Sequence, residues 1–576
     1  MREINNSSRR IQILALLTIV AVVFANSLFN HFVGDDEALF LKNTFYHSIA
    51  NVRFFFSKHY IANPAEYFGN EDYFNSGSVA YRPVVSLSYL FDYSVWGTNP
   101  FGYHLTNYLL HLTNCLLVYF LVGRLTAQNQ LAFFAALLFG IHPTKAEAVC
   151  AIGYRQDLLA AFFILLAILK HVTYSIKGIS RKWFWPILFY FLAVFTKESA
   201  VVMPVMVFLY DRFFHQEQSG KKVYISYAVV LVFYLFVYLF IFPNLSLVQH
   251  QFFNVFSFKY LYAIISLLAL NTLQLVWPFA LQPLPPLYLP AEAARVGIFS
   301  VVAVTIDAFL IGLTVRFFKQ QRIGSLFLLW FLIFYIPISN LVPLANPFTH
   351  RFLYLPSIGL LTALAIGLMK GYKFFAEKKK QVLFCAIVGI LSFFICLETV
   401  RLNMLWRSNV SLALNWVKYF PSEQKGFAIM AIEAHKALGC PTALPYLKKT
   451  LEFEPQDPRM HYMLGTCLDN IMESKARFQR AIDLNPNYRA PYIGMGKTFY
   501  AEGRYNDALN YFVIAHGQKR TFETYRLLML TYQRLKNKNK LLDVLSQART
   551  DLHVPAQLQV LEEIANQDLK SHEDAP

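Results

Sequence analysis

The chain has 576 residues, of which 56% are hydrophobic, 17% aromatic and only 15% charged, and its mean hydropathy is +0.38. An ordinary soluble domain is about one quarter charged, so this composition excludes disordered, collagen-like and disulfide-framework proteins and argues against a soluble one. A net charge of +17 would suggest nucleic acid in a soluble protein, but basic residues also collect in the cytoplasmic loops of membrane proteins. We therefore interpret the charge as membrane topology and expect membrane lipids, and no nucleic acid, as partners.

Apolar runs of the length of membrane helices fill the chain from residue 11 to about 399. They predict about eleven spans, near residues 11–30, 104–123, 130–147, 157–173, 183–196, 199–212, 223–243, 297–316, 324–343, 352–371 and 381–399. The first run has the features of a cleaved signal peptide, but its long apolar core favours a retained signal anchor. Residues 259–280 are also apolar enough to span; we expect a re-entrant or surface-lying segment there, the alternative being a true span.

The distribution of Lys and Arg predicts the orientation of these spans. Basic residues gather at the N-terminus and in alternate loops, which we place in the cytoplasm, whereas the first long loop, 31–103, is acidic. That loop would lie outside the cytoplasm, and an odd number of spans would place the C-terminal half outside as well. We therefore expect a multi-pass protein of the cytoplasmic (inner) membrane with an extracytoplasmic active site.

From residue 401 the chain is mixed, charged and helical in period, so we divide it into a membrane domain at 1–400, a connector at 401–424 and a soluble domain at 425–576. Similar segments recur in the soluble domain at spacings close to the tetratricopeptide period of about 34 residues. Three or four such repeats predict an α-solenoid that binds a protein or peptide acceptor, the alternative being a bare spacer. The fold class is therefore all-α, a polytopic helix bundle followed by a solenoid.

Ionisable residues at a membrane surface are costly, so a cluster of them indicates function. On the predicted outer side the sequence places Asp35, Asp36, Arg82, His104, His142, Glu147, Arg155, Asp157, Lys197, Glu198, Arg351 and Tyr354. An acidic pair can act as general base and as electrostatic stabiliser, and Arg and Lys bind phosphate. The combination predicts transfer of a group from a polyprenyl phosphate to a hydroxyl acceptor.

Simpler interpretations exist for each element of this cluster. The acidic pair can cap a helix, the two histidines can be satisfied interface residues, and Lys197 with Glu198 can form a structural ion pair. The sequence contains no His and Cys spacing typical of zinc, no Walker loop and no GxSxG elbow. The six cysteines are scattered without a CxxC pair, from which we infer neither a metal site nor a disulfide framework.

Seven sequence motifs, in this order, resemble the transmembrane and tetratricopeptide-repeat O-mannosyltransferase-like family, which has a GT-C glycosyltransferase membrane domain. They are FVGDDEALF at 32–40, YRPV at 81–84, GYHLTNYLLH at 102–111, FGIHPTKAEAVCAIGYRQDLLA at 139–160, FTKESAVVMPVMVFLYD at 195–211, PISNLVPLANPFTHRFLYLPSIG at 337–359 and the repeats. The resemblance covers nearly the whole chain.

The resemblance implies a lipid-phosphate sugar donor and catalysis by an acidic residue of the first outer loop, which is Asp35 by motif position, with Asp36 beside it. Length and repeat number suggest a bacterial relative using an undecaprenyl-phosphate sugar. No cofactor is certain; a divalent ion, Mn or Mg, at the acidic pair and Glu198 is one option. The chain departs from the family pattern at Thr144-Lys145, where the family tends to have a second His, and at His350, where it often has Glu.

Three functions remain open at this stage. The first is a glycosyltransferase that moves mannose or a similar sugar to Ser or Thr of extracytoplasmic proteins. The second is a GT-C enzyme that decorates a glycan or a lipid, and the third is a non-enzymatic, membrane-anchored repeat scaffold.

Overall fold

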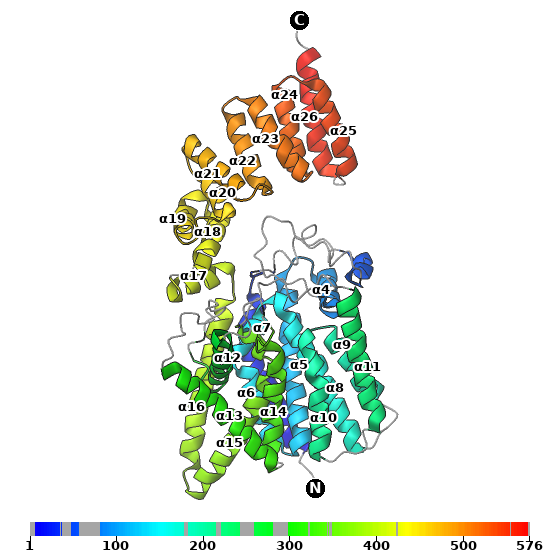
Figure 1. Cartoon of the computed structure of the whole chain (residues 1–576), viewed down its shortest axis with the longest axis vertical. Helices are drawn as coiled ribbons and strands as arrows, with labels where there is room; N and C mark the ends of the chain where they lie inside the picture. The colour runs from blue at the N-terminus through cyan, green and yellow to red at the C-terminus, as the bar shows by residue number, and fades with distance from the viewer. Residues whose placement is uncertain are drawn as a thin grey trace. The chain divides into compact units, whose positions relative to one another are not determined.

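The computed structural model describes residues 6–34, 36, 48–56, 81–177, 183–214, 220–241, 258–279, 281, 298–320, 323–342, 344, 348–421, 424–552 and 555–573. These residues are almost entirely helical, and no strand occurs among them, which confirms the all-α class. The chain forms two compact units that divide after Leu412, within the predicted connector (Figure 1).

The first unit is a helix bundle with short 3-10 or π segments between helices. Its elements are α1 (Asn6–Phe24), η1 (Ala25–Phe29), η4 (Ile49–Phe56), α4 (Pro83–Trp96), α5 (Pro100–Thr126), α6 (Asn129–Ile141), η5 (Pro143–Lys145), α7 (Ala146–Cys150), η6 (Ile152–Tyr154), α8 (Arg155–Lys177), α9 (Phe184–Val194), η8 (Glu198–Val202), α10 (Met203–Phe214), α11 (Gly220–Phe236), η10 (Val237–Ile241), α12 (Phe258–Val276), α13 (Ile298–Lys319), α14 (Ile323–Tyr335), η11 (Ile336–Ile338), η12 (His350–Leu353), α15 (Ser357–Glu377), α16 (Gln381–Leu405) and the first residues of α17 (Asn409–Tyr419).

Seven helices among the described residues are long and apolar enough to cross a membrane. They are Ser7–Phe29, Pro100–Thr126, Ile152–Ile176, Lys221–Phe240, Val301–Lys319, Ser357–Glu377 and Gln381–Leu405. Four further apolar helices are shorter, at Asn129–Ile141, Phe184–Val194, Tyr260–Val276 and Ile323–Ile338. A bilayer core needs about 20 helical residues, which is why this number is lower than the eleven spans that apolar runs predict. The exposed apolar side chains of α16, such as Val382 (77%) and Phe393 (60%), are suited to a lipid environment.

Helix α12, which covers most of the ambiguous 259–280 segment, has hydrogen bonds at both ends to the same end of the bundle. The Tyr260 hydroxyl donates to the carbonyl of Asn340, beyond the C-terminal end of α14. Near the other end, His142 Nε2 lies 3.2 Å from the carbonyl of Leu275, and His142 directly follows α6. A helix tied at both ends to one side of the bundle lies across that side, so the structure supports the surface-lying interpretation.

The second unit consists of successive helices that pack on their neighbours in chain order. They are α18 (Gln424–Leu438), α19 (Cys440–Phe453), α20 (Pro458–Thr466), α21 (Ile471–Leu484), α22 (Arg489–Ala501), α23 (Tyr505–Gln518), α24 (Phe522–Arg534), α25 (Lys538–Asp551) and α26 (Pro555–Glu573). The first helices of four pairs begin at residues 424, 458, 489 and 522, a spacing that fits the tetratricopeptide period of about 34 residues. Gly465, Gly494 and Gly496 let the rings of Phe478 and Phe512 approach the helix backbones, as the repeat pattern requires.

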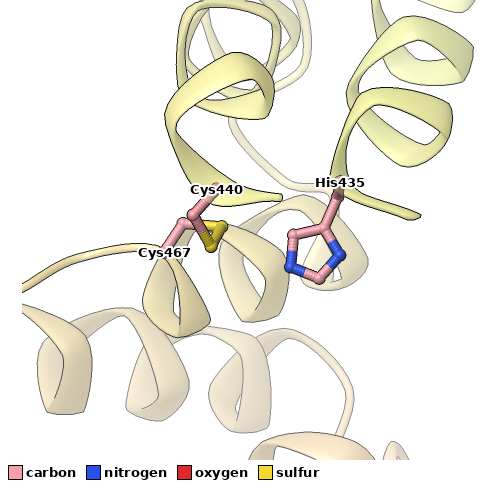
Figure 2. A group of neighbouring side chains, drawn as sticks. All are labelled: His435, Cys440 and Cys467. Carbon is pink, nitrogen blue, oxygen red and sulfur yellow. A yellow bond between two sulfur atoms is a disulfide. The ribbon is translucent and has the colours of Figure 1, made fainter. Parts of the chain in front are cut away.

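A disulfide joins Cys440 to Cys467 in this unit (Figure 2). The scattered cysteines did not predict this pair, because the two residues are 27 positions apart and only the packing of α18–α21 brings them together. His435 lies beside the pair, and these three residues are the one group of metal-binding composition among the described residues. Thiolates, not disulfide sulfurs, ligate metals, so the oxidised pair does not describe a metal site.

The close contact of α14 with α15 depends on Gly359. A Cβ at this position would lie 2.2 Å from the carbonyl oxygen of Phe327 and 2.6 Å from the amide nitrogen of Phe331. We expect Gly359→Ala to lower stability by about 1–3 kcal/mol, because the two helix backbones must separate. Gly367→Ala on the same helix is the control, since its Cβ would meet nothing within 4 Å. Thermal unfolding in detergent, followed by tryptophan fluorescence, measures both; equal midpoints would contradict the prediction.

Candidate active site

The candidate site is built around the segment between α6 and α8, where the chain turns through three short helices, η5, α7 and η6. Pro143 begins η5 and His142 caps it, accepting a hydrogen bond from the Thr144 amide. Residues 141–152 of this segment are all buried. The segment therefore carries charged side chains into the interior of one end of the bundle, where each of them needs a partner.

Three ion pairs join this segment and three other predicted clusters. Arg351, on η12, pairs with Glu147 at 2.5 Å, and its backbone amide also donates to that carboxylate at 3.2 Å. Lys197, which precedes η8, pairs with Asp157 at the start of α8. Arg351 Nε lies 4.0 Å from the second oxygen of Asp157, so this carboxylate connects two cations.

The third pair lies nearer the surface. Both carboxylate oxygens of Glu198 accept hydrogen bonds from Arg82 Nη2 at 3.0 Å, and the two side chains are 30% and 24% exposed. We call the six residues of the three pairs the charged cluster: Arg82, Glu147, Asp157, Lys197, Glu198 and Arg351. Residues from four separate parts of the sequence thus meet in one network. They are far apart along the chain, so only the fold brings them together.

Aromatic rings cover the cations of the charged cluster. The Arg351 guanidinium lies 3.7 Å from the centre of the Tyr154 ring, and the Lys197 ammonium lies 4.8 Å from that of Phe352. A narrow pocket opens beside them, and its walls include Asp157, Lys197 and Phe352. The other lining residues are Ala160, Ser199, Phe334, Ile338, Leu355 and Pro356. The pocket is small, about 10 Å³, and combines charged and apolar walls.

Burial and pairing act in opposite directions on the protonation of the cluster. Burial lowers the pKa of Lys197 below its ordinary value, although the Asp157 carboxylate opposes that shift. Burial favours the neutral form of Glu198, but the Arg82 guanidinium outweighs it and the pKa of Glu198 is below its usual value. Glu198 is therefore an anion at neutral pH and is poorly suited to be a proton-accepting base.

The charged cluster has unused hydrogen-bonding capacity among the described residues. Arg82 Nε and Arg351 Nε are buried donors without a hydrogen-bond partner, and Asp157 Oδ2 is a buried acceptor without one. Buried polar groups are normally satisfied, so such groups call for an explanation. A ligand that brings both acceptor oxygens and hydroxyl donors, as a sugar phosphate does, would match this set.

Asp36 is buried and binds to the same inserted segment. One carboxylate oxygen accepts a hydrogen bond from the Gly153 amide at 2.7 Å, and the other accepts one from the Val33 amide at 3.1 Å. Its position is thus fixed by two backbone donors, which also stabilise its negative charge. Asp35, the predicted base, lies outside the described residues.

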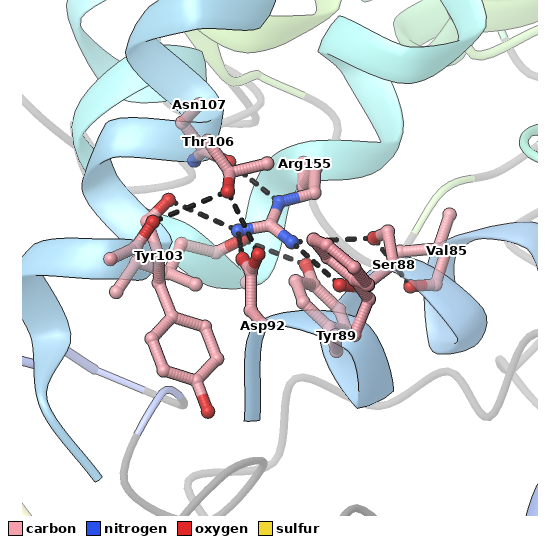
Figure 3. Close-up of polar contacts among 12 residues, drawn as sticks. Val85, Ser88, Tyr89, Asp92, Tyr103, Thr106, Asn107 and Arg155 are labelled. Carbon is pink, nitrogen blue, oxygen red and sulfur yellow. Dashed lines mark hydrogen bonds and ion pairs between the residues drawn. The ribbon is translucent and has the colours of Figure 1, made fainter. Parts of the chain in front are cut away.

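Arg155 belongs to a separate network (Figure 3). Its guanidinium pairs with Asp92 at 2.5 Å and donates to the Asn107 side chain at 2.7 Å and to the Tyr103 carbonyl at 3.0 Å. Ser88 accepts two more hydrogen bonds at 3.3 Å, so all five donors of the guanidinium face protein groups. We interpret Arg155 as a support that holds α4, α5 and α8 together.

The remaining predicted residues lie in neighbouring contacts outside the charged cluster. His104 lies 3.4 Å from the carbonyl of His31, and His142 contacts Thr144 and the carbonyl of Leu275. The Tyr354 hydroxyl lies 2.8 Å from His111 Nδ1. These contacts tie loops and helices to one another and match the structural alternatives given for the two histidines.

Two important residues were not predicted as site residues from the sequence. Asp92 appears there only as one of several acidic residues, whereas it is the buried partner of Arg155. Lys145 is completely buried; its Nζ donates to Ser357 Oγ at 2.6 Å and to Thr144 Oγ1 at 3.2 Å. A lysine within an apolar motif was the available signal for Lys145, because a charge there must be paired or neutral.

The two arginine pairs lead to contrasting expectations. Arg155→Met leaves Asp92 as an unpaired buried charge, which costs about 3–5 kcal/mol. Arg82→Met breaks a partly exposed pair and costs about 0–1 kcal/mol. Thermal unfolding of both variants in detergent measures the difference, and comparable midpoints would contradict the assignment of Arg155 as the structural support.

Lys145 leads to an expectation about pH. Burial lowers the pKa of Lys145 well below its ordinary value, so below about pH 10 the unfolded chain binds a proton that the folded chain does not. Stability due to this residue should therefore rise between pH 7 and pH 9 in unfolding experiments, and Lys145→Met should weaken that rise. A wild-type slope retained in Lys145→Met would show that the amine is not neutral when buried.

Comparison with known proteins supports the family resemblance, although no family model matches the chain. Protein O-mannosyl-transferase TMTC3 of Mus musculus is 24% identical over 521 residues, 82% of this chain and 55% of the relative. Protein O-mannosyl-transferase F38B6.6 of Caenorhabditis elegans is 23% identical over 498 residues, 83% of this chain and 63% of the relative. Protein O-mannosyl-transferase TMTC2 of Mus musculus is 35% identical over 155 residues, which are 26% of this chain and 18% of the relative.

The chain thus spans between about half and two thirds of the length of the relatives that it matches along most of its sequence. These relatives are animal proteins and lend no support to the expectation of a bacterial source. The similarity extends over four fifths of the chain, so the chain is a distant homologue of proteins named protein O-mannosyl-transferases, as its motifs indicated.

Proposed function

We propose that this protein is an integral-membrane glycosyltransferase that moves mannose or a similar sugar from a polyprenyl-phosphate donor to a hydroxyl of an extracytoplasmic protein. The observation that carries the proposal is the charged cluster with its unused donors and acceptor, set against a pocket with apolar walls. The printed names of the homologues, all protein O-mannosyl-transferases, support the same reaction class.

In the proposed reaction the acceptor oxygen attacks the anomeric carbon of the sugar and the bond from that carbon to the phosphate oxygen breaks. The polyprenyl phosphate leaves with the electron pair of that bond. Arg82, Lys197 and Arg351 bind the phosphate, whose oxygens accept from the guanidinium donors. Asp35 takes the proton of the acceptor hydroxyl, and the sugar is transferred with inversion.

Asp36 has a different role in this proposal. Its carboxylate is fixed by the amides of Gly153 and Val33, so it holds the first outer loop against the inserted segment. We therefore assign Asp36 as a positioning residue and Asp35 as the base.

A divalent ion has no step in this mechanism. Of the three carboxylates considered for Mg or Mn, Asp36 is bound by two backbone amides and Glu198 by the Arg82 guanidinium, and Asp35 lies outside the described residues. The proposed mechanism assigns phosphate binding to Arg82, Lys197 and Arg351 instead.

We infer that the site and the C-terminal unit lie on the extracytoplasmic side of a membrane. Seven long apolar helices support the membrane location, and the Lys and Arg distribution supports the orientation. The Cys440–Cys467 disulfide is an independent argument, because disulfides persist mainly in oxidising compartments outside the cytosol.

The helix pairs of the C-terminal unit are proposed to receive the acceptor protein as tetratricopeptide repeats do. Their spacing supports this role, and the homologues' names point to a protein acceptor. A GT-C enzyme that decorates a glycan or lipid would share the charged cluster but would leave these helix pairs without a function. A non-enzymatic scaffold would leave the charged cluster unexplained.

The proposal predicts that Asp35→Asn abolishes sugar transfer while the protein still inserts into the membrane. Glu37→Gln is the matched control, since it removes a charge from the same loop and should retain transfer. The measurement follows radiolabelled sugar from the membrane-lipid pool into protein and glycan fractions at equal membrane expression. Label lost from protein supports the proposal and label lost from glycan supports the GT-C alternative. Unchanged label in both fractions would overturn Asp35 as the base.

A further inference from the structure

The Cys440–Cys467 disulfide joins two successive helix pairs of the C-terminal unit. Cys440 is the first residue of α19, and Cys467 directly follows α20. The bond therefore links the turn between α18 and α19 to the turn between α20 and α21. Because the curvature of a helical array comes from the small rotation between successive pairs, this bond fixes that rotation at one point of the array.

The two sulfurs differ in their accessibility. Cys467 is buried, with 7% of its surface exposed, whereas Cys440 is partly exposed. Thiol–disulfide exchange begins with attack of a thiolate on one sulfur, so access decides which sulfur is attacked. A thiol from solution therefore reaches Cys440 first, and Cys467 becomes the leaving group.

The surroundings of the bond favour its opening. Cys440 occupies the N-terminal end of α19, following Gly439 at φ +78°, and the positive end of a helix stabilises a thiolate. His435, near the end of α18, has a ring nitrogen within 4.8 Å of both sulfurs (Figure 2). An imidazole at that distance can supply a proton to the leaving thiolate or stabilise it as a cation.

We propose that Cys440–Cys467 is an exchange-competent disulfide, at which thiols of the surrounding compartment open and close the link between the first two helix pairs. An incoming thiolate attacks Cys440 Sγ, the S–S bond breaks, and its electron pair leaves on Cys467 Sγ, which takes up a proton. A second thiolate then attacks the incoming sulfur, and the Cys440 thiolate released at the helix end takes up the second proton. Two thiols become one disulfide, and the protein gains two electrons and two protons.

Opening the bond removes the covalent constraint between the α18–α19 and α20–α21 pairs, which stay packed through Leu447, Met460 and Leu464. The chemistry of the bond stands independently of any sugar transfer. Its consequence for acceptor binding rests on the proposed function, because that function assigns the acceptor to this array.

The test treats the full-length protein, purified in detergent, with reduced glutathione and follows free thiols by alkylation and peptide mass spectrometry. We expect the pair to open while the protein stays folded by circular dichroism, with the first glutathione adduct on Cys440. His435→Ala should slow opening by about tenfold, because the leaving thiolate loses its neighbour. Lys436→Ala is the matched control, since it removes a charge from the same turn and should open at the wild-type rate.

Single-cysteine variants test the difference in reactivity between Cys440 and Cys467 when no disulfide can form. Cys467→Ser should leave a reactive Cys440, whereas Cys440→Ser should leave Cys467 slow to react in the folded protein. Opening that requires denaturant, a first adduct on Cys467, or a rate unchanged by His435→Ala would each overturn the proposal and leave a purely structural crosslink. None of these measurements requires sugar transfer, so a failure of the proposed enzymatic function would not affect their outcome.

Discussion

The requirement that a buried charge be paired determines how one end of the membrane unit is organised. The segment between α6 and α8 carries Glu147 and Asp157 into a buried position, where an unpaired carboxylate would be costly. Their partners Arg351 and Lys197 come from turns that are distant in sequence. Pairing therefore brings these turns together, and the narrow pocket forms where they meet.

Two arginine–carboxylate pairs at the end of the bundle with the charged cluster have different roles, one structural and one in the candidate site. The Arg155–Asp92 pair is fully buried and every guanidinium donor has a protein acceptor, so Arg155 has no free donor for a ligand. The Arg82–Glu198 pair is partly exposed and keeps a buried Nε without a partner among the described residues. A guanidinium whose donors are all bonded supports the scaffold, whereas a partly exposed arginine with an unbonded donor is the one suited to the phosphate contact of the proposed function.

The sequence predicted the helical class and all six residues of the charged cluster, because apolar length and costly charges are local signals. It could not predict which charges pair. Arg155 and Asp92 are 63 positions apart, and only the packing of α4, α5 and α8 brings them together. Short helices such as α6 and α9 were predicted too long because apolar runs continue into the buried turns that follow. Lys145 and the disulfide were missed for the same reason, since only tertiary packing reveals burial and proximity.

The disulfide and the position of the charged cluster both bear on the side of the membrane at which the chain leaves the membrane unit. Helix α16 begins after the basic Lys378–Lys380 turn and ends where Arg401 binds the carbonyl of Leu281, at the end of the bundle that carries the charged cluster. The chain therefore leaves the membrane unit on the side of the charged cluster, and the residues that follow include a disulfide that the cytosol would reduce. The proposed orientation takes the opposite end as cytoplasmic from the bias of Lys and Arg, to which the Lys378–Lys380 turn contributes. The disulfide is the separate observation that supports the proposed orientation, because disulfides persist mainly in oxidising compartments.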